Sequence, residues 1–423
     1  MSRLRRHIKL NLVAIITVIK GEIYMKKKSL SLMLALVMLV TLAFTGCSSS
    51  PSGTAANSSS KGNDDLGIAL ITSAAGANDK GYNQSAIEGL KKVKDEFGIN
   101  YKVVEATDVP GSLTQLASAG YKLIFSLEYN FDALINGVGG SKPIAEQYPD
   151  TTFVVFNDNP NVNEDGSVKH KNVVSVLFDV HEASFLAGAV STLVNENAST
   201  LFNATDYAFT TGDAGRKVGF LGGSKSNGIT VFGYGFAEGI NYVAKELGVK
   251  YTFYSDYNAG FSDSAAGATK ANTYYSDGAN IVYAVAGAVG DGVDAKAKEV
   301  KKLSIEVDAD KDSNQPGYVL TSVLKNTEVP VYEISKNYKE NTMDQVNGKV
   351  LSYNLASGAT GITDLSVIES KITDTGKAKW NEIKAQLKTI ADKIASGDIK
   401  VTNAQAGEAL DKAKLENLNM PND

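Results

Sequence analysis

The sequence from residue 66 onward alternates short apolar segments with amphipathic segments, and this alternation occurs in two successive series. The first series predicts strands at residues 67–72, 101–104, 123–127 and 152–156 and helices at residues 84–97, 113–119 and 131–148. The second series predicts strands at residues 218–222, 251–254, 281–286 and 303–307 and helices at residues 182–194, 232–247, 263–276 and 292–300. Continuous apolar strands that alternate with helices are typical of a parallel sheet covered on both faces. The pattern therefore predicts an α/β fold with two lobes.

Later segments of the chain extend this pattern. Residues 319–325 are expected to form a helical run that ends at Lys325. Residues 380–394 carry apolar side chains at helical spacing, with Trp380 as a packing anchor rather than a ligand contact. We expect lobe 1 to comprise residues 66–180 plus about 312–345, lobe 2 to comprise residues 181–311 plus about 346–402, and residues 403–423 to form a C-terminal tail.

Cys47 is the only cysteine in the 423-residue chain, and it follows an apolar segment that begins after three lysines. Positive, apolar and small residues follow one another here in the order of a secretory signal peptide. The segment resembles a bacterial lipobox, whose cysteine is diacylated; the alternative is a signal-anchor helix with an idle thiol. We expect a leader or over-extended start at residues 1–24, a lipoprotein signal peptide at 25–46 and a flexible tether at 47–65. This order predicts a lipid-anchored protein on the extracytoplasmic face of the cell membrane.

The composition argues against several classes of function. A formal net charge of −5 disfavours nucleic acid as a partner, because such binding needs a dense basic face. A single cysteine cannot supply a disulfide framework or a thiolate metal site. Beyond the leader only His170 and His181 are present, so we expect no metal, no cofactor and no enzymatic activity.

Ligands of α/β proteins bind beyond the carboxyl ends of the parallel strands, so we expect two facing lobes to enclose a ligand cleft there. Asp79, Tyr82 and Asn83 lie in the loop after the first predicted strand, and we expect them at this cleft. A carboxylate, an aromatic face and an amide together suit a flat heterocycle that bears N–H donors. The alternative is that Asp79 and Asn83 only cap the following helix.

Further candidate residues lie at the ends of the predicted strands of the second lobe. Asp308 follows one such strand, where its carboxylate can accept hydrogen bonds from the vicinal hydroxyls of a sugar, with Lys325 as a donor to the same sugar. Gly287 lies in a turn where backbone N–H groups can approach a ligand closely. Phe232 can present an aromatic ring to the same cleft. The alternatives are an exposed turn for Asp308 and a core position for Phe232.

Six segments in a fixed order give the chain a resemblance to a known family. They are residues 78–85, 178–188, 218–223, 277–287, 307–310 and 320–325. The chain resembles the basic membrane protein family of lipoproteins, which includes purine nucleoside receptors that feed ABC transporters. The resemblance implies the type I periplasmic-binding-protein fold, with two Rossmann-like lobes and a ligand cleft between them.

The resemblance also implies roles for individual residues. The expected contacts are Asp79 and Asn83 at the base edge, Tyr82 or Phe232 by stacking, and Asp308, Lys325 and the region of Gly287 at the ribose.

The chain departs from the family pattern at three places. Asn157 stands where the family usually has an aspartate, so either Asn157 alters the base preference or Asp158 substitutes. Ile87 replaces an aromatic residue that is common in its helix, and residues 312–316 form an extra segment before Lys325. These departures bear on the identity of the ligand more than on the fold.

The leading hypothesis is a monomeric substrate-binding protein that captures a nucleoside, with a purine favoured, and delivers it to an ABC transporter permease. One alternative is a sensory lipoprotein with the same fold that signals to a membrane partner. Another is a binder of a sugar or other small polar ligand. An enzyme is disfavoured because the sequence contains no motif that pairs a nucleophile with a base.

Overall fold

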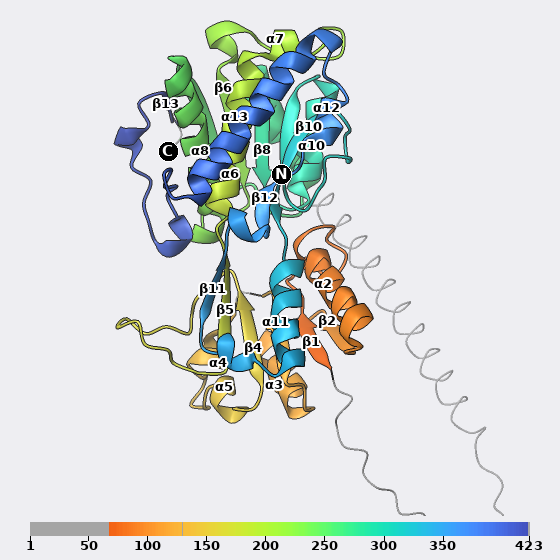
Figure 1. The fold of residues 1–423 in the computed structure, drawn as a ribbon, viewed down its shortest axis with the longest axis vertical. Helices are drawn as coiled ribbons and strands as arrows, with labels where there is room; N and C mark the ends of the chain where they lie inside the picture. Colours follow the sequence, from red (N-terminus) through yellow and green to blue (C-terminus); the bar gives the residue numbers. More distant parts are fainter. Residues whose placement is uncertain (1–66, 129, 422–423) are drawn as a thin grey trace, which may run out of the picture. The chain divides into compact units, whose positions relative to one another are not determined.

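The computed structural model describes residues 67–128 and 130–421, which form two mainly parallel sheets covered by helices (Figure 1). The 6-stranded sheet has the order β11-β5-β4-β3-β1-β2, with β1 at Ile68–Ile71, β2 at Tyr101–Val104, β3 at Leu123–Ser126, β4 at Thr152–Phe156, β5 at Val173–Phe178 and β11 at Val350–Tyr353. The 7-stranded sheet has the order β12-β10-β9-β8-β6-β7-β13, with β6 at Lys217–Gly222, β7 at Tyr251–Asp256, β8 at Ile281–Val285, β9 at Leu303–Asp308, β10 at Val319–Lys325, β12 at Thr360–Ile362 and β13 at Leu418–Asn419. The predicted α/β class is confirmed. Cys47 and the predicted signal peptide and tether lie outside the described residues.

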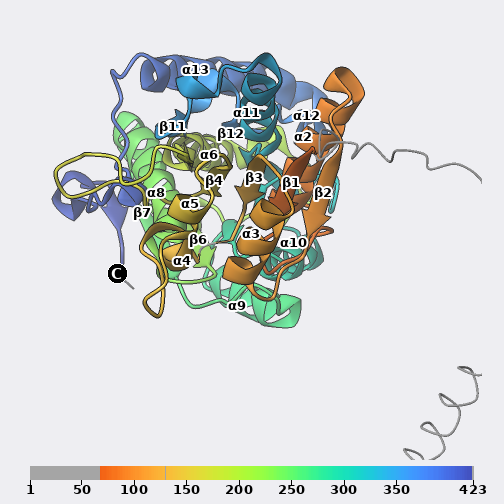
Figure 2. The ribbon, with the colours of Figure 1, turned by 90° about the horizontal axis from the view of Figure 1, so that it is seen from below.

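Helices cover both faces of the first sheet, as the continuous apolar strands require. In the described residues of both lobes, the helices are α2 (Tyr82–Phe97), α3 (Val109–Ser118), α4 (Asp132–Ile135), α5 (Ile144–Gln147), α6 (Val180–Glu196), α7 (Ala198–Leu201), α8 (Asn227–Leu247), α9 (Ser264–Ser276), α10 (Val289–Glu299), α11 (Glu328–Glu340), α12 (Ser366–Glu369) and α13 (Lys377–Ala395). Ile68 and Leu70 pack in the cluster that contains α2 and α11, whereas Ala69 and Ile71 pack with α3. Figure 2 shows α2 and α11 on one side of these strands and α3 and α5 on the other.

The chain passes between the two sheets at three places in its described part, after β5, after β10 and after β11. Residues 319–325 are therefore strand β10 of the second sheet, and the expected helical run at this position is wrong. The run is short, buried and rich in β-branched residues, which suits a central strand. The lobe boundaries differ accordingly from those expected. β10 lies in the second sheet, α11 packs on α2, and β11 lies in the first sheet.

The segment between β3 and β4 also differs from the expected single helix over residues 131–148. It forms the two short helices α4 and α5 instead. Gly137 has a φ of 74°, and a Cβ atom at this position would lie 2.1 Å from the Ser141 carbonyl oxygen. A tight turn that only glycine accommodates thus divides the helix. The strand β5 was not predicted at all.

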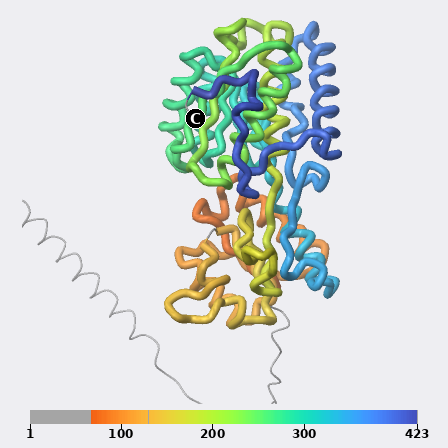
Figure 3. The backbone as a smooth tube through the Cα atoms, turned by 90° about the vertical axis from the view of Figure 1, so that its left-hand side faces the viewer, coloured from red at the N-terminus to blue at the C-terminus, as the bar shows by residue number. Residues whose placement is uncertain are grey.

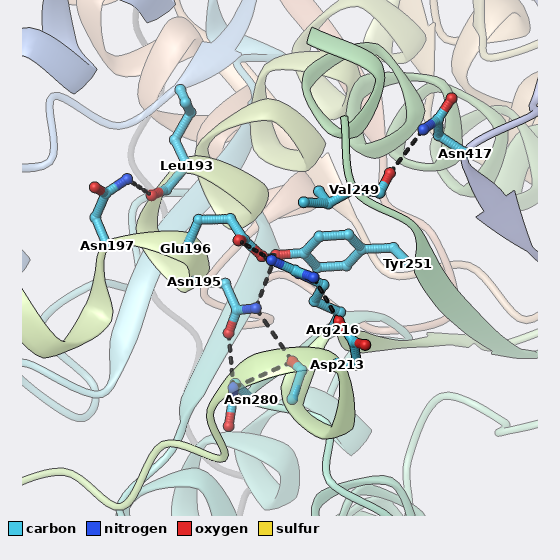
Figure 4. A network of polar contacts seen from close by, with 11 residues as sticks. Leu193, Asn195, Glu196, Asn197, Asp213, Arg216, Val249, Tyr251, Asn280 and Asn417 are labelled. Carbon is cyan, nitrogen blue, oxygen red and sulfur yellow. Dashed lines mark hydrogen bonds and ion pairs between the residues drawn. The ribbon is translucent and has the colours of Figure 1, made fainter. Parts of the chain in front are cut away.

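A polar network fixes the edge of the second sheet at which its strands begin (Figure 4). The Arg216 guanidinium donates two hydrogen bonds of 2.9 Å to the Glu196 carboxylate, and the Tyr251 hydroxyl donates a third of 2.7 Å. Asn195 Nδ2 donates to the Tyr251 hydroxyl at 2.8 Å, and Asn280 Nδ2 donates to Asn195 Oδ1 at 2.7 Å. These bonds tie the end of α6 to the starts of β6, β7 and β8. The network therefore lies at the opposite edge from the carboxyl ends of these strands.

Helices α6 and α8 cross closely because glycines lie at their contact. A Cβ atom on Gly188 would lie 2.2 Å from the Phe236 carbonyl oxygen, and one on Gly239 would lie 2.0 Å from the Phe185 carbonyl oxygen. Both distances are too short for any side chain, so the spacing of the two helices depends on these residues.

We expect Gly239→Ala to lower the free energy of unfolding by about 1–3 kcal/mol, because the added methyl group overpacks a backbone contact. Urea unfolding of the two proteins measures the difference. Gly228→Ala in the same helix is the matched control, since no atom lies within 4 Å of a Cβ there. A Gly239→Ala variant as stable as the wild type would show that α6 and α8 can move apart without cost.

The chain ends with a helix and an extended segment that both pack on the second lobe. The predicted apolar side chains of α13, from Trp380 to Ile394, are buried, and Trp380 is 1% exposed, which confirms its packing role. The expected tail continues along α8 and ends beside β7 as β13 (Figure 3). Within the described residues, no helix combines the length and apolar character that crossing a membrane requires.

Candidate functional site

The carboxyl ends of the parallel strands carry most of the predicted site residues. Asn157 follows β4 in the first sheet, whereas Gly287 follows β8, and Asp308 and Lys325 end β9 and β10 in the second sheet. Tyr82 begins α2 and Phe232 lies in α8. The topology therefore places these residues where ligands of α/β proteins bind.

Lys325 brings residues of both lobes together. Its Nζ lies 5.1 Å from the centroid of the Tyr82 ring, 5.4 Å from that of Phe178 and 5.9 Å from that of Phe232. Each ring comes from a different element, and each distance suits a cation–π contact. The predicted residues Tyr82, Phe232 and Lys325 thus meet at one point. Phe178 belongs to the same group but was not predicted, because the strand that carries it was missed.

The electrostatic setting of Lys325 is unusual for a lysine. The side chain is only 7% exposed, and burial lowers its pKa to about 8, although the nearby carboxylate of Asp308 acts in the opposite direction. Asp308 pairs with Leu324 in the register of β9 and β10, and its φ is 75°. Gly81 lies across from it, with the position of its absent Cβ 3.5 Å from the Asp308 Cβ. Asp308 is thus held between the two lobes.

A buried acidic pair lies behind the end of β9. Asp294 and Glu306 are each 1% exposed, and burial raises the pKa of both carboxyl groups. Lys311 Nζ lies 3.1 Å from Glu306 Oε2. Burial opposes the charge of Lys311, but the carboxylates of Glu306 and Asp308 raise its pKa. Asp308 therefore has two cationic neighbours, Lys325 and Lys311.

Asp79 and Asn83 organise the loop that begins α2. The Asp79 carboxylate accepts hydrogen bonds from the backbone N–H groups of Gly81, Asn83 and Gln84 at 2.9–3.1 Å. Asn83 is fully buried; its Nδ2 donates to Ser73 Oγ, the Gly76 carbonyl oxygen and Asp79 Oδ2, and its Oδ1 accepts from the Ser73 N–H. The structure therefore gives Asp79 the capping role that the sequence left open, whereas Asn83 ties the preceding loop to the start of α2. Contact with a base by either one stays a prediction.

Asn157 and Tyr82 are linked directly. Asn157 is 7% exposed and has a φ of 64°, and its Nδ2 donates to the Tyr82 hydroxyl at 2.6 Å. The Tyr82 hydroxyl in turn lies 3.4 Å from the Leu127 carbonyl oxygen. Asp158, the alternative to Asn157, is exposed. Of Asn157 and Asp158, Asn157 is therefore the residue that contacts the Tyr82 hydroxyl group.

A second aromatic residue that was not predicted lies beside the glycine turns of the second lobe. Phe261 is 50% exposed, and its carbonyl oxygen accepts a hydrogen bond of 2.9 Å from the N–H of Ala288. Gly287 has a φ of 54°, and a Cβ on Gly223 would lie 2.2 Å from the Phe261 ring. The glycines thus make room for Phe261. An exposed phenylalanine in a loop rich in Gly, Ser and Asp is the only sequence signal that marks it.

The described residues contain no group of three or more histidine, cysteine, aspartate or glutamate side chains that could hold a metal ion.

Comparisons with known proteins agree with this arrangement. The sequence model of a family described as "ABC transporter substrate-binding protein PnrA-like" matches residues 68–393. The chain is 29% identical over 390 residues to "ABC transporter nucleoside-binding protein BmpA" of Lactococcus lactis, covering 86% of this chain and 99% of that protein. It is 30% identical over 288 residues to "Basic membrane protein A" of Borreliella afzelii, covering 67% of this chain and 78% of that protein.

Solved structures support the fold. The crystal structure of an ABC transporter solute-binding protein from Aeropyrum pernix superposes with a TM-score of 0.61 at 22% identity, covering 79% of this chain and 93% of that one. The expected type I periplasmic-binding-protein fold is confirmed. Because the family match spans most of the chain, the protein belongs to the basic membrane protein (PnrA-like) family of ABC transporter substrate-binding proteins, which are not enzymes.

Proposed function

We propose that this protein captures a nucleoside, preferably a purine nucleoside, and delivers it to the permease of an ABC transporter. The observation that carries the proposal is the meeting of three aromatic rings with Lys325 and Asp308 at the carboxyl ends of the strands. Aromatic rings provide faces for a base, and a carboxylate beside an ammonium group provides an acceptor and a donor for ribose hydroxyls. The name of the Lactococcus lactis relative, which describes a nucleoside-binding protein, supports the same choice of ligand.

The expected interactions are strong enough for transport at low ligand concentration. Stacking of a base on an aromatic side chain contributes about 1–3 kcal/mol, and each hydrogen bond to a charged group contributes about 1.5–3 kcal/mol. A few such contacts in a closed cleft give micromolar affinity or better, which corresponds to about −8 kcal/mol.

Isothermal titration of the purified protein tests this proposal. Inosine, guanosine, adenosine, uridine and ribose are added in turn, after unfolding and refolding to remove any ligand that co-purifies. Saturable 1:1 binding of a purine nucleoside supports the proposal, and binding of ribose alone would favour a sugar-binding protein. Heat from none of the five ligands would contradict nucleoside capture.

We also propose that Cys47 carries a lipid and anchors the protein, as a monomer, to the extracytoplasmic face of the membrane. The support is its position as the only cysteine, directly after an apolar segment with small residues. Metabolic labelling with radioactive palmitate is expected to mark the wild-type protein and not Cys47→Ser. Equal labelling of both proteins would contradict the anchor at this residue.

A further inference from the structure

The C-terminal strap, residues 396–421, follows α13 and lies beyond the residues matched by the family model. Its short 3₁₀ turn Ala404–Ala406 packs on α8, and two hydrogen bonds fix the chain just before the turn to the second lobe. The Thr402 N–H and hydroxyl donate to the Glu238 carboxylate of α8 at 2.8 and 2.6 Å. The Asn403 side chain accepts hydrogen bonds from the backbone N–H groups of Gln405 and Ala406. The backbone around Gln405 is therefore fixed by the hydrogen bonds of Thr402 and Asn403.

The side chain of Gln405 reaches the first lobe. Its Nε2 donates a hydrogen bond of 2.6 Å to the backbone carbonyl oxygen of Asn157, 248 residues away in the sequence. Asn157 directly follows β4, its N–H donates to the Val176 carbonyl oxygen at 2.8 Å, and its φ of 64° lies in the left-handed region. Asparagine tolerates this conformation better than most other residues do. The Gln405 hydrogen bond adds a contact to its carbonyl group from the other lobe.

Asn157 also contacts Tyr82, one of the three aromatic residues around Lys325. Asn157 Nδ2 donates to the Tyr82 hydroxyl at 2.6 Å, and the Tyr82 ring faces Lys325 Nζ at 5.1 Å. The Thr327 hydroxyl donates to the Tyr82 carbonyl oxygen at 2.7 Å, so the backbone beside the ring is also fixed. Two hydrogen bonds in series thus connect the C-terminal strap to the ring that lies against Lys325.

We propose that Gln405 is a positioning residue for the ligand cleft: through Asn157 it sets the orientation of the Tyr82 ring, so that the C-terminal strap forms part of the nucleoside site. The inference rests on the proposed function for its ligand, but the hydrogen-bonded link can be tested without one. Because Gln405 and Asn157 belong to different lobes, a hinge motion that separates the lobes breaks the link. The strap then orders the ring only when the cleft is closed.

The test uses the purified protein and three variants. Gln405→Glu keeps the size of the side chain but replaces the N–H donor with an oxygen that repels the Asn157 carbonyl group. Lys412→Ala changes an exposed residue of the same strap and is the control. Tyr82→Phe removes the hydroxyl group at the far end of the link. We expect Gln405→Glu to weaken inosine binding about 3- to 10-fold, the effect of one lost hydrogen bond, and Lys412→Ala to leave it unchanged.

A double-mutant cycle separates positioning from a general structural effect. In the Tyr82→Phe background, Gln405→Glu is expected to change inosine affinity by less than about 2-fold, because residues that act through one another do not add. The melting temperature of Gln405→Glu is expected to stay within about 2 °C of the wild type. An undiminished effect in the Tyr82→Phe background, or no effect in the wild-type background, would overturn the inference.

Hydrogen exchange read by mass spectrometry gives a second readout that needs no ligand. Peptides that contain Tyr82 and Asn157 are expected to exchange faster in Gln405→Glu than in Lys412→Ala, while peptides from α13 exchange equally. If the wild-type protein binds no nucleoside but this difference is present, the proposed function fails and the link stands. If exchange is the same in all the proteins, the link itself is wrong.

Discussion

Asp308→Ala is expected to weaken purine nucleoside binding about 10- to 100-fold, because it removes hydrogen bonds to a charged group, each worth about 1.5–3 kcal/mol. The carboxylate ends β9, is partly exposed and lies near both Lys325 and Lys311. A ligand hydroxyl group that binds there donates to an acceptor whose charge is already balanced by the protein. Isothermal titration with inosine measures the loss.

Two further variants make the Asp308 experiment specific. With a φ of 75°, Asp308 occupies a backbone region that asparagine tolerates and alanine does not. Asp308→Asn therefore removes the charge while keeping the backbone, and we expect it to lose most of the affinity that alanine loses. Asp310→Ala alters an exposed carboxylate of the same turn and is expected to bind normally. Equal binding by Asp308→Asn and the wild type would assign the effect of alanine to backbone strain.

Lys325→Met is expected to change ligand binding and stability in opposite directions. Burial lowers the pKa of Lys325 to about 8 from its ordinary value of 10.5, so the unfolded chain binds more protons than the folded one between these values. The free energy of unfolding therefore carries a penalty below about pH 8 that is relieved as the pH rises toward 10.5. Methionine removes the penalty, and we expect a gain of about 1–3 kcal/mol at pH 7. Inosine affinity is expected to fall about 10-fold or more, because a charged donor is lost.

Lys302→Met provides the matched comparison for Lys325→Met. Burial lowers the pKa of Lys302 to about 8 as well, but its Nζ donates to Thr210 Oγ1 at 3.0 Å and also contacts Asn280 Oδ1. Its replacement removes one donor from each acceptor, and Asn280 Oδ1 keeps only the Thr210 N–H, so we expect a loss of about 1–3 kcal/mol. Urea unfolding at pH 7 and pH 10 measures both variants. A stability change of the same sign in both would contradict the view that Lys325 is retained for binding at a cost in stability.

The sequence predicted the fold class and the main strands because short apolar runs that alternate with amphipathic helices are typical of a parallel sheet. It misassigned residues 319–325 because a short apolar run alone does not distinguish a strand from a buried helical segment, and only pairing with β9 identifies it as a strand. The resemblance placed Tyr82, Phe232 and Lys325 at one site, and the structure brings them together.

Local sequence could not decide the roles of Asp79 and Asn83, since a helix cap and a ligand contact use the same residue types. The contact of Gln405 with Asn157 was not predictable either. It joins residues that are 248 positions apart, and no motif around either residue indicates a contact with the other. Such contacts depend on how the lobes meet, which the periodicity of a sequence does not encode.

The three passages of the chain between the sheets determine the order in which the protein can fold as it is synthesised. The first sheet receives its edge strand β11 only with Val350–Tyr353, and the second sheet receives β12 only afterwards, with Thr360–Ile362. Neither sheet can therefore be completed on a nascent chain until most of the protein has emerged. Pairings over such long sequence separations form slowly, and a chain truncated before Val350 leaves β5 as an open edge that is prone to aggregation.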